Sequence, residues 1–322
     1  RVAAENLHHI RKFTEVPQLK VKMYNGHHPD GYSPMVITDW YEFLSFYVAQ
    51  KVPDIPEGLQ QASVPLFEEN FGMAEGFGAN RFGTYLPDDF EGALAAYEDE
   101  APIQVLVESG ADTTPPGATG ERVRWDFDRY PAAEAKATKW FLGDEGTLQP
   151  DAPSTAGADG YLYDRTSGSK RTTDAGSGDF QQPAPTLPIN WEQAPEGKLV
   201  AYATPELTDD VVVSGYGYLD LWVKPGADDG AVEVDLTEVR PDGSETYVQS
   251  GWHNLAHAGL DNELTTGFQV EYSFASADRV ALRPDAWVHR KVPIPGVTHI
   301  FRTGSRLRVT VSAPGRSRPL WS

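Results

Sequence analysis

The first part of the chain is organised around a stretch that reads Leu19-Lys20-Val21-Lys22-Met23-Tyr24-Asn25-Gly26-His27-His28-Pro29-Asp30-Gly31. Val21 and Met23 alternate with lysine and tyrosine, which predicts a strand of roughly five residues. Ser33 and Pro34 then predict the N-cap and the first position of a helix that extends to about Lys51. The predicted apolar stripe of this helix comprises Val36, Trp40, Phe43, Leu44, Tyr47 and Val48.

The turn between this strand and this helix carries two histidines. A histidine in such a loop can serve as the general base of an α/β hydrolase, because the sheet and the helix hold the imidazole still above the strand ends. The alternative is that the pair His27-His28 is an ordinary surface feature of a turn.

The same residues resemble a known family. The segment Asn25-Gly26-His27-His28-Pro29-Asp30 fits the pattern Asn-Gly-x-His-x-Asp, and Trp40-Tyr41-Glu42-Phe43-Leu44 follows it. Both segments are similar to the cocaine-esterase/X-prolyl dipeptidyl-peptidase (CocE/NonD) family of serine hydrolases. The resemblance implies that His28 is the catalytic histidine and that His27 fills a variable position.

The composition limits the possible functions. A length of 322 residues predicts about two domains, and 30 glycines with 25 prolines favour a β-rich chain with many turns. The net charge of −20 argues against nucleic acid or an anionic membrane as a partner. The sequence contains no apolar run of about 18 residues that would span a bilayer. The absence of cysteine excludes disulfides, thiol catalysis and cysteine-type zinc sites.

The nucleophile expected of a serine hydrolase is missing from the sequence. In α/β hydrolases the serine and the aspartate precede the histidine in the chain. The pattern Gly-x-Ser-x-Gly does not occur; the nearest candidate, Ser177, has Ala175 and Asp179 in place of the two glycines. We therefore expect the Ser and Asp to lie outside this chain, in an upstream part of the same enzyme.

Residues 57–100 differ from their surroundings, because they contain ten acidic residues and one basic residue, Arg81. We interpret them as an acidic connecting segment that packs across a domain junction, with a short helix from Asp89 to Tyr97. The simplest interpretation of these acids is a solvated surface. The alternative is that some of them attract a cationic substrate, such as a free α-amine.

Residues 101–322 are predicted to form a mostly antiparallel β-sandwich, which residues 103–107 open as its first strand. Residues 140–146 predict a strand and a turn, and residues 151–186 a long surface excursion. Period-two alternation predicts strands with one buried and one wet face. The predicted buried sets are Leu219, Leu221 and Val223; Val232, Val234 and Leu236, opposite Glu233, Asp235 and Thr237; and Leu307, Val309 and Val311. Residues 241–244 predict a hairpin turn between two such strands.

This C-terminal region also resembles the CocE/NonD family. Residues 219–223, 236–243, 250–252 and 299–308, together with His257, look in order like its C-terminal jelly-roll domain, a galactose-binding-like sandwich. The resemblance implies three parts. Residues 1–56 would be the C-terminal part of an α/β-hydrolase domain, residues 57–100 a connecting segment, and residues 101–322 the jelly-roll domain. The resemblance also implies that the sandwich buttresses the catalytic domain.

The remaining conspicuous residues have structural interpretations. The histidines His253, His257, His289 and His299 lack a metal-ligand spacing, so we expect them in turns and at the sandwich interface. Neither Asp209-Asp210 nor Asp228-Asp229 belongs to a calcium-ligand series. A glycan-stacking platform is conceivable, but aromatic residues in alternating strands are more often core. The tryptophans concerned are Trp191, Trp222, Trp252, Trp287 and Trp321. We therefore expect a packing partner without an exposed aromatic row, and no cofactor or metal.

The sequence thus predicts part of a serine hydrolase that cleaves ester or amide bonds, either acyl or aminoacyl bonds or those after an X-Pro dipeptide. His28 would act in a Ser–His–Asp triad on a small-molecule ester or a peptide. Two alternatives stay open: a non-catalytic carbohydrate- or surface-binding sandwich, and a structural subunit associated with a separate catalytic chain. The resemblance favours a bacterial protein of the cell envelope or exterior.

Overall fold

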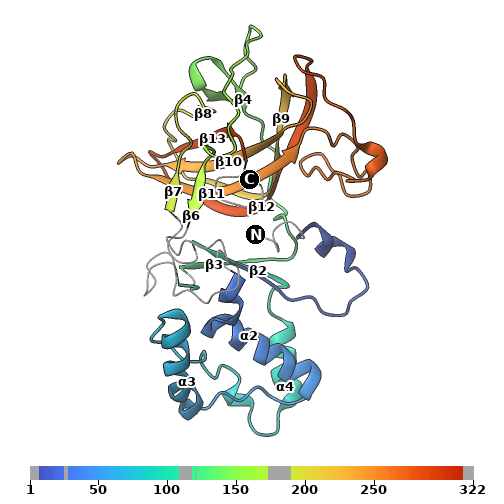
Figure 1. The fold of residues 1–322 in the computed structure, drawn as a ribbon. Helices are drawn as coiled ribbons and strands as arrows, with labels where there is room; N and C mark the ends of the chain where they lie inside the picture. The colour runs from blue at the N-terminus through green and yellow to red at the C-terminus, as the bar shows by residue number, and fades with distance from the viewer. Residues whose placement is uncertain (1–6, 25–27, 109–117, 121, 173–189, 315–322) are drawn as a thin grey trace. The chain divides into compact units, whose positions relative to one another are not determined.

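A computed structural model describes residues 7–24, 28–108, 118–120, 122–172 and 190–314 (Figure 1). The chain divides into two compact units. Among the described residues, 15–130 form the first, which we call the helical unit. The second contains residues 7–14, 131–172 and 190–314, and we call it the sandwich unit. No helix of the described residues is long and apolar enough to cross a bilayer.

The helical unit contains a three-stranded sheet in the order β1-β2-β3. Its strands are β1 (Val21–Tyr24), β2 (Ile103–Val107) and β3 (Val123–Phe127). β1 and β2 are parallel, with Val21 opposite Ile103, whereas β2 and β3 are antiparallel. The sequence places β2 at the start of the sandwich, but in the structure it lies beside β1. A strand that is buried along its whole length has a continuous apolar pattern, and this pattern does not specify its partner.

The strand, turn and helix expected around the histidines are present. After β1 comes a 3₁₀ helix, η2 (His28–Tyr32), and then α2 (Pro34–Leu44), which continues as one π-helical segment, η3 (Ser45–Ala49). Ser33 occupies the N-cap with an extended backbone, but its side chain makes no capping hydrogen bond. The helix ends where Gln50 adopts a left-handed conformation with φ of 51°.

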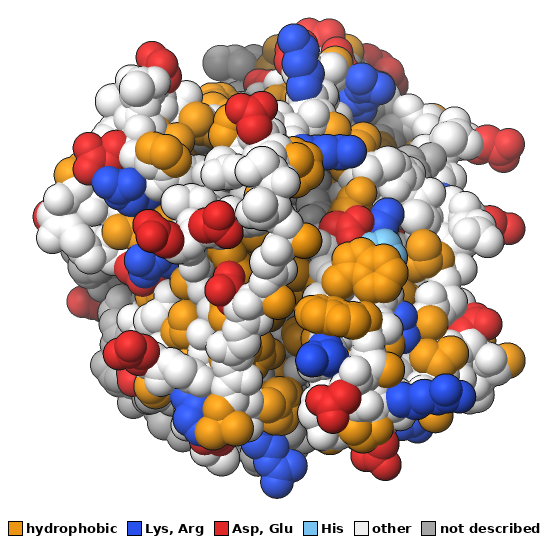
Figure 2. Space-filling model, turned by 90° about the horizontal axis from the view of Figure 1, so that it is seen from above, with side chains coloured by type: hydrophobic (Ala, Val, Ile, Leu, Met, Phe, Trp, Pro, Cys, Tyr) orange, Lys and Arg blue, Asp and Glu red, His pale blue; other side chains and the backbone are white. Residues whose placement is uncertain are grey.

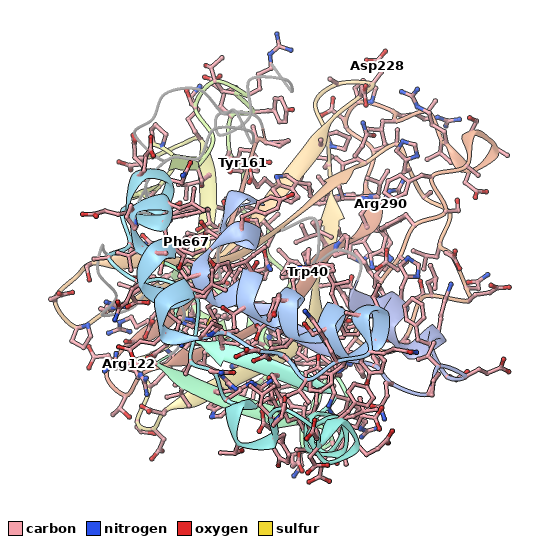
Figure 3. All side chains as sticks on the ribbon, turned by 90° about the horizontal axis from the view of Figure 1, so that it is seen from below. Trp40, Phe67, Arg122, Tyr161, Asp228 and Arg290 are labelled. Carbon is pink, nitrogen blue, oxygen red and sulfur yellow. The ribbon has the colours of Figure 1, made fainter. Side chains whose placement is uncertain are left out.

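The predicted apolar stripe of α2 is wrong in its orientation. Val36 is buried as expected, but Trp40 is 56% exposed and Val48 is 72% exposed; Phe43 and Leu44 are exposed as well. The buried face instead carries Glu42 and Phe46. The reason is that Arg81 neutralises the carboxylate of Glu42, which allows a face containing a charge to enter the core of the helical unit. Figure 3 labels Trp40 on α2 and Phe67 on the neighbouring helix α3 (Glu57–Phe71).

The acidic segment 57–100 supplies a large part of the core of the helical unit. It forms α3 (Glu57–Phe71), η4 (Gly83–Tyr85) and α4 (Phe90–Glu98). The predicted short helix is confirmed as α4, and the Asp89 carboxylate caps it by accepting a hydrogen bond from Gly92 N at 2.9 Å. Phe46 packs edge-on against Phe82, with ring centroids 5.0 Å apart. Five of the ten acids lie on α3 and α4, whose other sides carry buried apolar residues, so the segment is not simply a solvated loop.

The sandwich unit contains a four-stranded sheet, in the order β11-β10-β13-β8, and a two-stranded sheet, β12-β9 (Figure 1). Every pair in these two sheets is antiparallel. The strands are β8 (Leu199–Ala203), β9 (Val211–Val223), β10 (Ala231–Val239), β11 (Glu245–Asn254), β12 (Val288–Phe301) and β13 (Arg306–Ser312). One apolar cluster contains residues of both sheets, including the three predicted buried sets. The predicted sandwich and its inward faces are confirmed.

The second face of β10 differs from the prediction. Glu233, Asp235 and Thr237 were expected to face water, but all three are buried. The Asp235 carboxylate accepts a hydrogen bond from the Ser250 hydroxyl, and the Thr237 hydroxyl donates to Glu245 Oε1 at 2.6 Å. Because neighbouring strands supply these partners, polar side chains can be buried on this face at a modest cost.

Short elements complete the two units. They are η1 (Leu7–Lys12), β4 (Phe141–Leu142), η5 (Asp144–Gly146), β5 (Leu148–Gln149), β6 (Lys170–Thr172), β7 (Asn190–Glu192) and η6 (Ser276–Asp278). The predicted strand and turn at 140–146 correspond to β4 and η5. The predicted hairpin turn joins β10 to β11, and Gly243 adopts φ of +83° there. Residues 151–165 are mostly exposed, as expected for a surface excursion, while residues 173–186 lie outside the described part of the chain.

Candidate active site

The predicted catalytic histidine follows the carboxyl end of a parallel strand. The backbone of His28 begins η2, immediately before the N-terminus of α2. Asn25, Gly26 and His27 lie outside the described residues. In α/β structures, ligands bind beyond the carboxyl ends of parallel strands, so His28 is at the edge of the sheet where catalytic groups are usually found.

The residues that follow His28 are held firmly. The Asp30 side chain is buried, and the backbone carbonyl oxygen of Asp30 accepts a hydrogen bond from Ser33 N at 3.0 Å. Burial, with added repulsion from Asp30 and Asp39, raises the pKa of Tyr24 to about 12, so this phenol stays protonated at neutral pH. Lys22 on β1 forms an ion pair with Asp39 on α2. The strand, the turn and the helix are therefore tied together around His28.

A carboxylate lies at the same edge, at the end of the neighbouring strand. Glu108 follows β2 directly, adopts φ of 56°, and forms an ion pair with Arg122 at 3.4 Å. Because β1 and β2 are parallel, the Glu108 backbone and the His28 turn follow corresponding ends of adjacent strands. A positive φ at a residue other than glycine or asparagine is uncommon and is often found at functional sites. Glu108 was not predicted as a site residue. The only feature of the sequence that points to it is an acidic residue directly after a buried strand.

Charged side chains around the buried Glu42 fix α2 to the rest of its unit. Arg81 donates to both carboxylate oxygens of Glu42, at 2.8 and 2.6 Å, and also pairs with Glu100. Lys20, next to β1, donates to the carbonyl oxygens of Glu98 and Glu100. Burial lowers the pKa of Lys20, although the nearby carboxylates oppose that change. This network holds both α2 and the start of β1 against the end of α4.

The described part of the chain does not bring a complete triad together. Ser177, the nearest sequence match to a nucleophile, lies outside the described residues, as does His27. No group of three or more His, Cys, Asp or Glu side chains among the described residues is arranged to hold a metal ion. The candidate residues at this edge of the sheet are therefore His28 and the buried Asp30, which follow β1, and Glu108, which follows β2.

Comparison with known families gives a clear result. The model of the X-Pro dipeptidyl-peptidase C-terminal non-catalytic domain matches residues 95–317. This chain belongs to that family. The resemblance to the cocaine-esterase/X-prolyl dipeptidyl-peptidase group, first seen in the motifs, is confirmed, and the match covers all the strands of the sandwich.

Solved structures of hydrolases and an aminopeptidase are also similar to the chain. An aminopeptidase from a marine sediment Thaumarchaeota archaeon is 17% identical, with a TM-score of 0.47 over 76% of this chain and 40% of that one. A CocE/NonD family hydrolase from Staphylococcus aureus is 16% identical, with a TM-score of 0.47. The match covers 73% of this chain and 40% of the hydrolase. An α-amino acid ester hydrolase is 16% identical, with a TM-score of 0.48. The match covers 80% of this chain and 40% of that hydrolase. The chain thus spans 40% of the length of each. No curated protein sequence matches it.

Within the X-Pro dipeptidyl-peptidase C-terminal domain, the histidines lie in hydrogen-bonded structural positions. His253 is buried, stacks on Tyr272 and lies with Nε2 at 2.8 Å from the carbonyl oxygen of His257. Burial lowers the pKa of His253 to about 4, so its ring is neutral at pH 7. His299 bonds to the buried Glu238 at 3.0 Å. The expectation that these histidines lie in turns and at the sandwich interface is confirmed for His253 and His299, but it is wrong for His289, whose side chain is 43% exposed on β12.

The tryptophans of this domain depart from the prediction. Trp222 is 67% exposed and Trp287 is 52% exposed, although both were expected in the core. Trp191 and Trp252 are partly buried, and Trp321 lies outside the described residues. The reason for Trp222 is its position on β9, where even-numbered residues alternate with the core residues Leu221 and Val223. The expectation that the domain has no exposed aromatic row is therefore wrong.

Proposed function

We propose that this chain is the histidine-bearing, C-terminal portion of a serine hydrolase that cleaves ester or amide bonds. The observation that carries the proposal is the position of His28, directly after a parallel strand and before a helix, in a chain of the X-Pro dipeptidyl-peptidase C-terminal family. In this proposal residues 1–56 belong to an α/β-hydrolase domain, residues 57–100 connect it, and residues 101–322 form a jelly-roll domain. The pairing of β2 with β1 extends the hydrolase part to include that strand.

Two features support a further polypeptide beside the helical unit. Within the described residues β1 has one strand neighbour, so its other edge offers unpaired backbone groups. The outer face of α2 exposes Trp40 and Val48, with Phe43 and Leu44 beside them. A free sheet edge next to an apolar helix face is what an α/β sheet presents where additional strands and helices join it.

The proposed chemistry follows from the role that we assign to His28. His28 removes the proton from the serine hydroxyl as the hydroxyl attacks the carbonyl carbon, and it then donates that proton to the leaving alcohol or amine. A carboxylate supplied by the same enzyme holds the other ring nitrogen and stabilises the imidazolium. Water then hydrolyses the acyl-enzyme by the same sequence of proton transfers. The proposed substrates are acyl or aminoacyl esters and amides, or peptides with an X-Pro N-terminus.

The test uses the complete enzyme, which contains this chain and the part carrying the Gly-x-Ser-x-Gly serine. A fluorophosphonate probe is expected to label that serine, and the enzyme is expected to hydrolyse a p-nitrophenyl ester or an X-Pro-p-nitroanilide. This chain on its own is expected to show neither reaction. Full labelling and full turnover after His28→Ala would contradict the proposal.

A further inference from the structure

The outer face of the two-stranded sheet β9-β12 carries a continuous row of aromatic and charged side chains. In the register of this sheet Trp222 pairs with His289, Asp220 pairs with Lys291, and Tyr218 pairs with Pro293. These residues point away from the core, because Leu219, Leu221 and Val223 between them pack inward. Lys224 and Trp287 extend the row by one step beyond the paired segment.

Each aromatic ring in this row lies beside a basic group. The rings of Trp222 and His289 stack with centroids 5.0 Å apart and planes 24° apart. Lys224 Nζ lies 5.7 Å from the ring centroid of Trp287, and Lys291 Nζ lies 4.7 Å from that of Tyr218. The Asp220 carboxylate bonds to His289 Nε2. The row therefore alternates flat apolar rings with charged hydrogen-bonding groups.

The charge of this row is opposite to that of the chain. Lys224 and Lys291 outnumber Asp220, and the carboxylate of Asp220 is already directed at His289, so the row is basic. The chain as a whole has a net charge of −20. A single exposed aromatic residue needs no explanation, but two exposed tryptophans and a half-buried tyrosine in one row, each beside a histidine or a lysine, indicate a binding surface. In the space-filling view, exposed hydrophobic side chains gather beside a histidine and several lysine or arginine side chains (Figure 2).

A small pocket lies at one end of the row. It is lined by Tyr216, Gly217, Pro293 and Ile294 of the sheet and by Gln269, Val270 and Glu271 of the loop beside it. Gln269 is buried and donates from Nε2 to Glu271 Oε1 at 3.2 Å. Since Pro293 also pairs with Tyr218, the pocket continues directly from the row.

We propose that this face binds an acidic polysaccharide, a chain of sugars that carry carboxylates. Sugar rings have flat apolar faces that stack on Trp222, Trp287 and Tyr218, while their carboxylates pair with Lys224 and Lys291. The Asp220–His289 pair offers a hydroxyl group both an acceptor and a donor. Trp222 and Tyr218 lie on β9, and Trp287 lies one residue before β12, so the rings follow the strand direction, a geometry that suits an extended polymer better than insertion into a bilayer.

This inference does not depend on the hydrolase proposal, because it concerns a different unit of the chain and needs no nucleophile. The experiment measures binding of oligogalacturonate and of a neutral dextran oligomer to the purified chain by calorimetry, at low and high salt. We expect oligogalacturonate to bind, and dextran to bind at least about tenfold more weakly. Raising the salt concentration is expected to weaken oligogalacturonate binding, because the lysine–carboxylate pairs are exposed.

Matched variants locate the site. Trp222→Ala is expected to weaken oligogalacturonate binding about tenfold or more, because it removes the central ring. The double variant Lys224→Gln/Lys291→Gln is expected to weaken binding and to reduce its salt dependence. Trp40→Ala removes another exposed tryptophan, from the helical unit, and is expected to leave binding unchanged. Circular dichroism and melting temperatures of all variants show whether they fold.

Several results would overturn the inference. These are the absence of oligogalacturonate binding, equal and salt-independent binding of dextran, and unchanged affinity in a folded Trp222→Ala variant. Binding to phosphatidylserine vesicles or to a polyglutamate peptide, without binding to oligogalacturonate, would assign the surface to a membrane or to an acidic protein instead.

Discussion

Arg81 and Glu42 form a two-point ion pair inside the helical unit: the guanidinium donates from Nε and from Nη2 to the two oxygens of a carboxylate that is 1% exposed. The pair decides which face of α2 enters the core. Without the guanidinium, this position of the helix could not be buried, since an isolated carboxylate in the interior is very costly.

The first prediction concerns this pair. Arg81→Met should lower the free energy of unfolding by about 3–5 kcal/mol, because it leaves Glu42 buried without its partner. Urea unfolding followed by circular dichroism measures the change. The double variant Arg81→Met/Glu42→Leu should recover most of the loss, because no charge then stays buried. A double variant as unstable as Arg81→Met alone would show that the ion pair does not account for the effect.

The second prediction concerns His28. In the complete enzyme, His28→Ala should lower kcat by several orders of magnitude, on the order of 10⁴-fold or more, because the serine loses its base. His27→Ala is the matched control and should cost far less. His28 occupies the histidine position of the pattern Asn-Gly-x-His-x-Asp, whereas His27 fills its variable position. Equal losses in the two variants, with both folded, would mean that the histidines act as a structural pair.

The third prediction concerns pH and the buried Glu238. Burial alone would raise the pKa of this carboxyl, but hydrogen bonds from His299 and from Arg302 N outweigh it and hold the pKa at about 2, below its ordinary value of 4.5. The carboxylate therefore contributes its full stability above about pH 4.5, and the contribution is lost as the pH falls towards 2. Its size is on the order of 3 kcal/mol.

Glu238→Gln tests this assignment. The variant should be less stable than the native protein at pH 7, and the difference should shrink steadily between pH 4.5 and pH 2, because only the native protein loses the carboxylate. Urea midpoints measured across this range give the comparison. A difference that stays constant down to pH 2 would show that Glu238 is not ionised in the folded state as we describe.

The fourth prediction concerns Gly251 on β11. A Cβ at this position would lie 1.8 Å from the carbonyl oxygen of Pro293 and 2.8 Å from its carbonyl carbon. Because these atoms belong to the backbone of β12, they cannot rotate away. Gly251→Ala should therefore lower the free energy of unfolding by about 2 kcal/mol or more. Gly217→Ala, on β9 with nothing within 4 Å of its Cβ position, should change it much less. Equal effects would show that the approach of β11 to β12 is looser than described.

Local sequence patterns predicted the helices and strands well where neighbouring residues in the sequence are enough to fix the structure. Val232, Val234 and Leu236 alternate strictly, and their inward orientation was readable from the sequence. The Pro34 start of α2 was predicted in the same way. The backbone of His28 lies in the predicted turn, although its catalytic role rests on the family resemblance.

Patterns failed where distant residues decide the outcome. Asp235 is buried because Ser250, on another strand, donates to it, and the sequence around Asp235 gives no sign of this. The orientation of α2 depends on Arg81, which is 39 residues from Glu42. An apolar stripe on a helix shows that this face can be buried, but it does not show that residues of the same chain bury it. Trp222 is a different case: the alternation of Leu221 and Val223 already indicated its outward position, but the general preference of aromatic residues for the core was given more weight.

The parallel pairing of β1 with β2 has a consequence for how the helical unit folds. Val21 must meet Ile103 across a long loop, and the entropy of closing such a loop has to be offset before the sheet gains any stability. The helices α2, α3 and α4 fill this loop, and their local contacts can form early and shorten the distance that must be closed. We therefore expect the sheet to be completed late in folding. The His28 turn, which depends on β1, then becomes ordered only when the whole unit is in place.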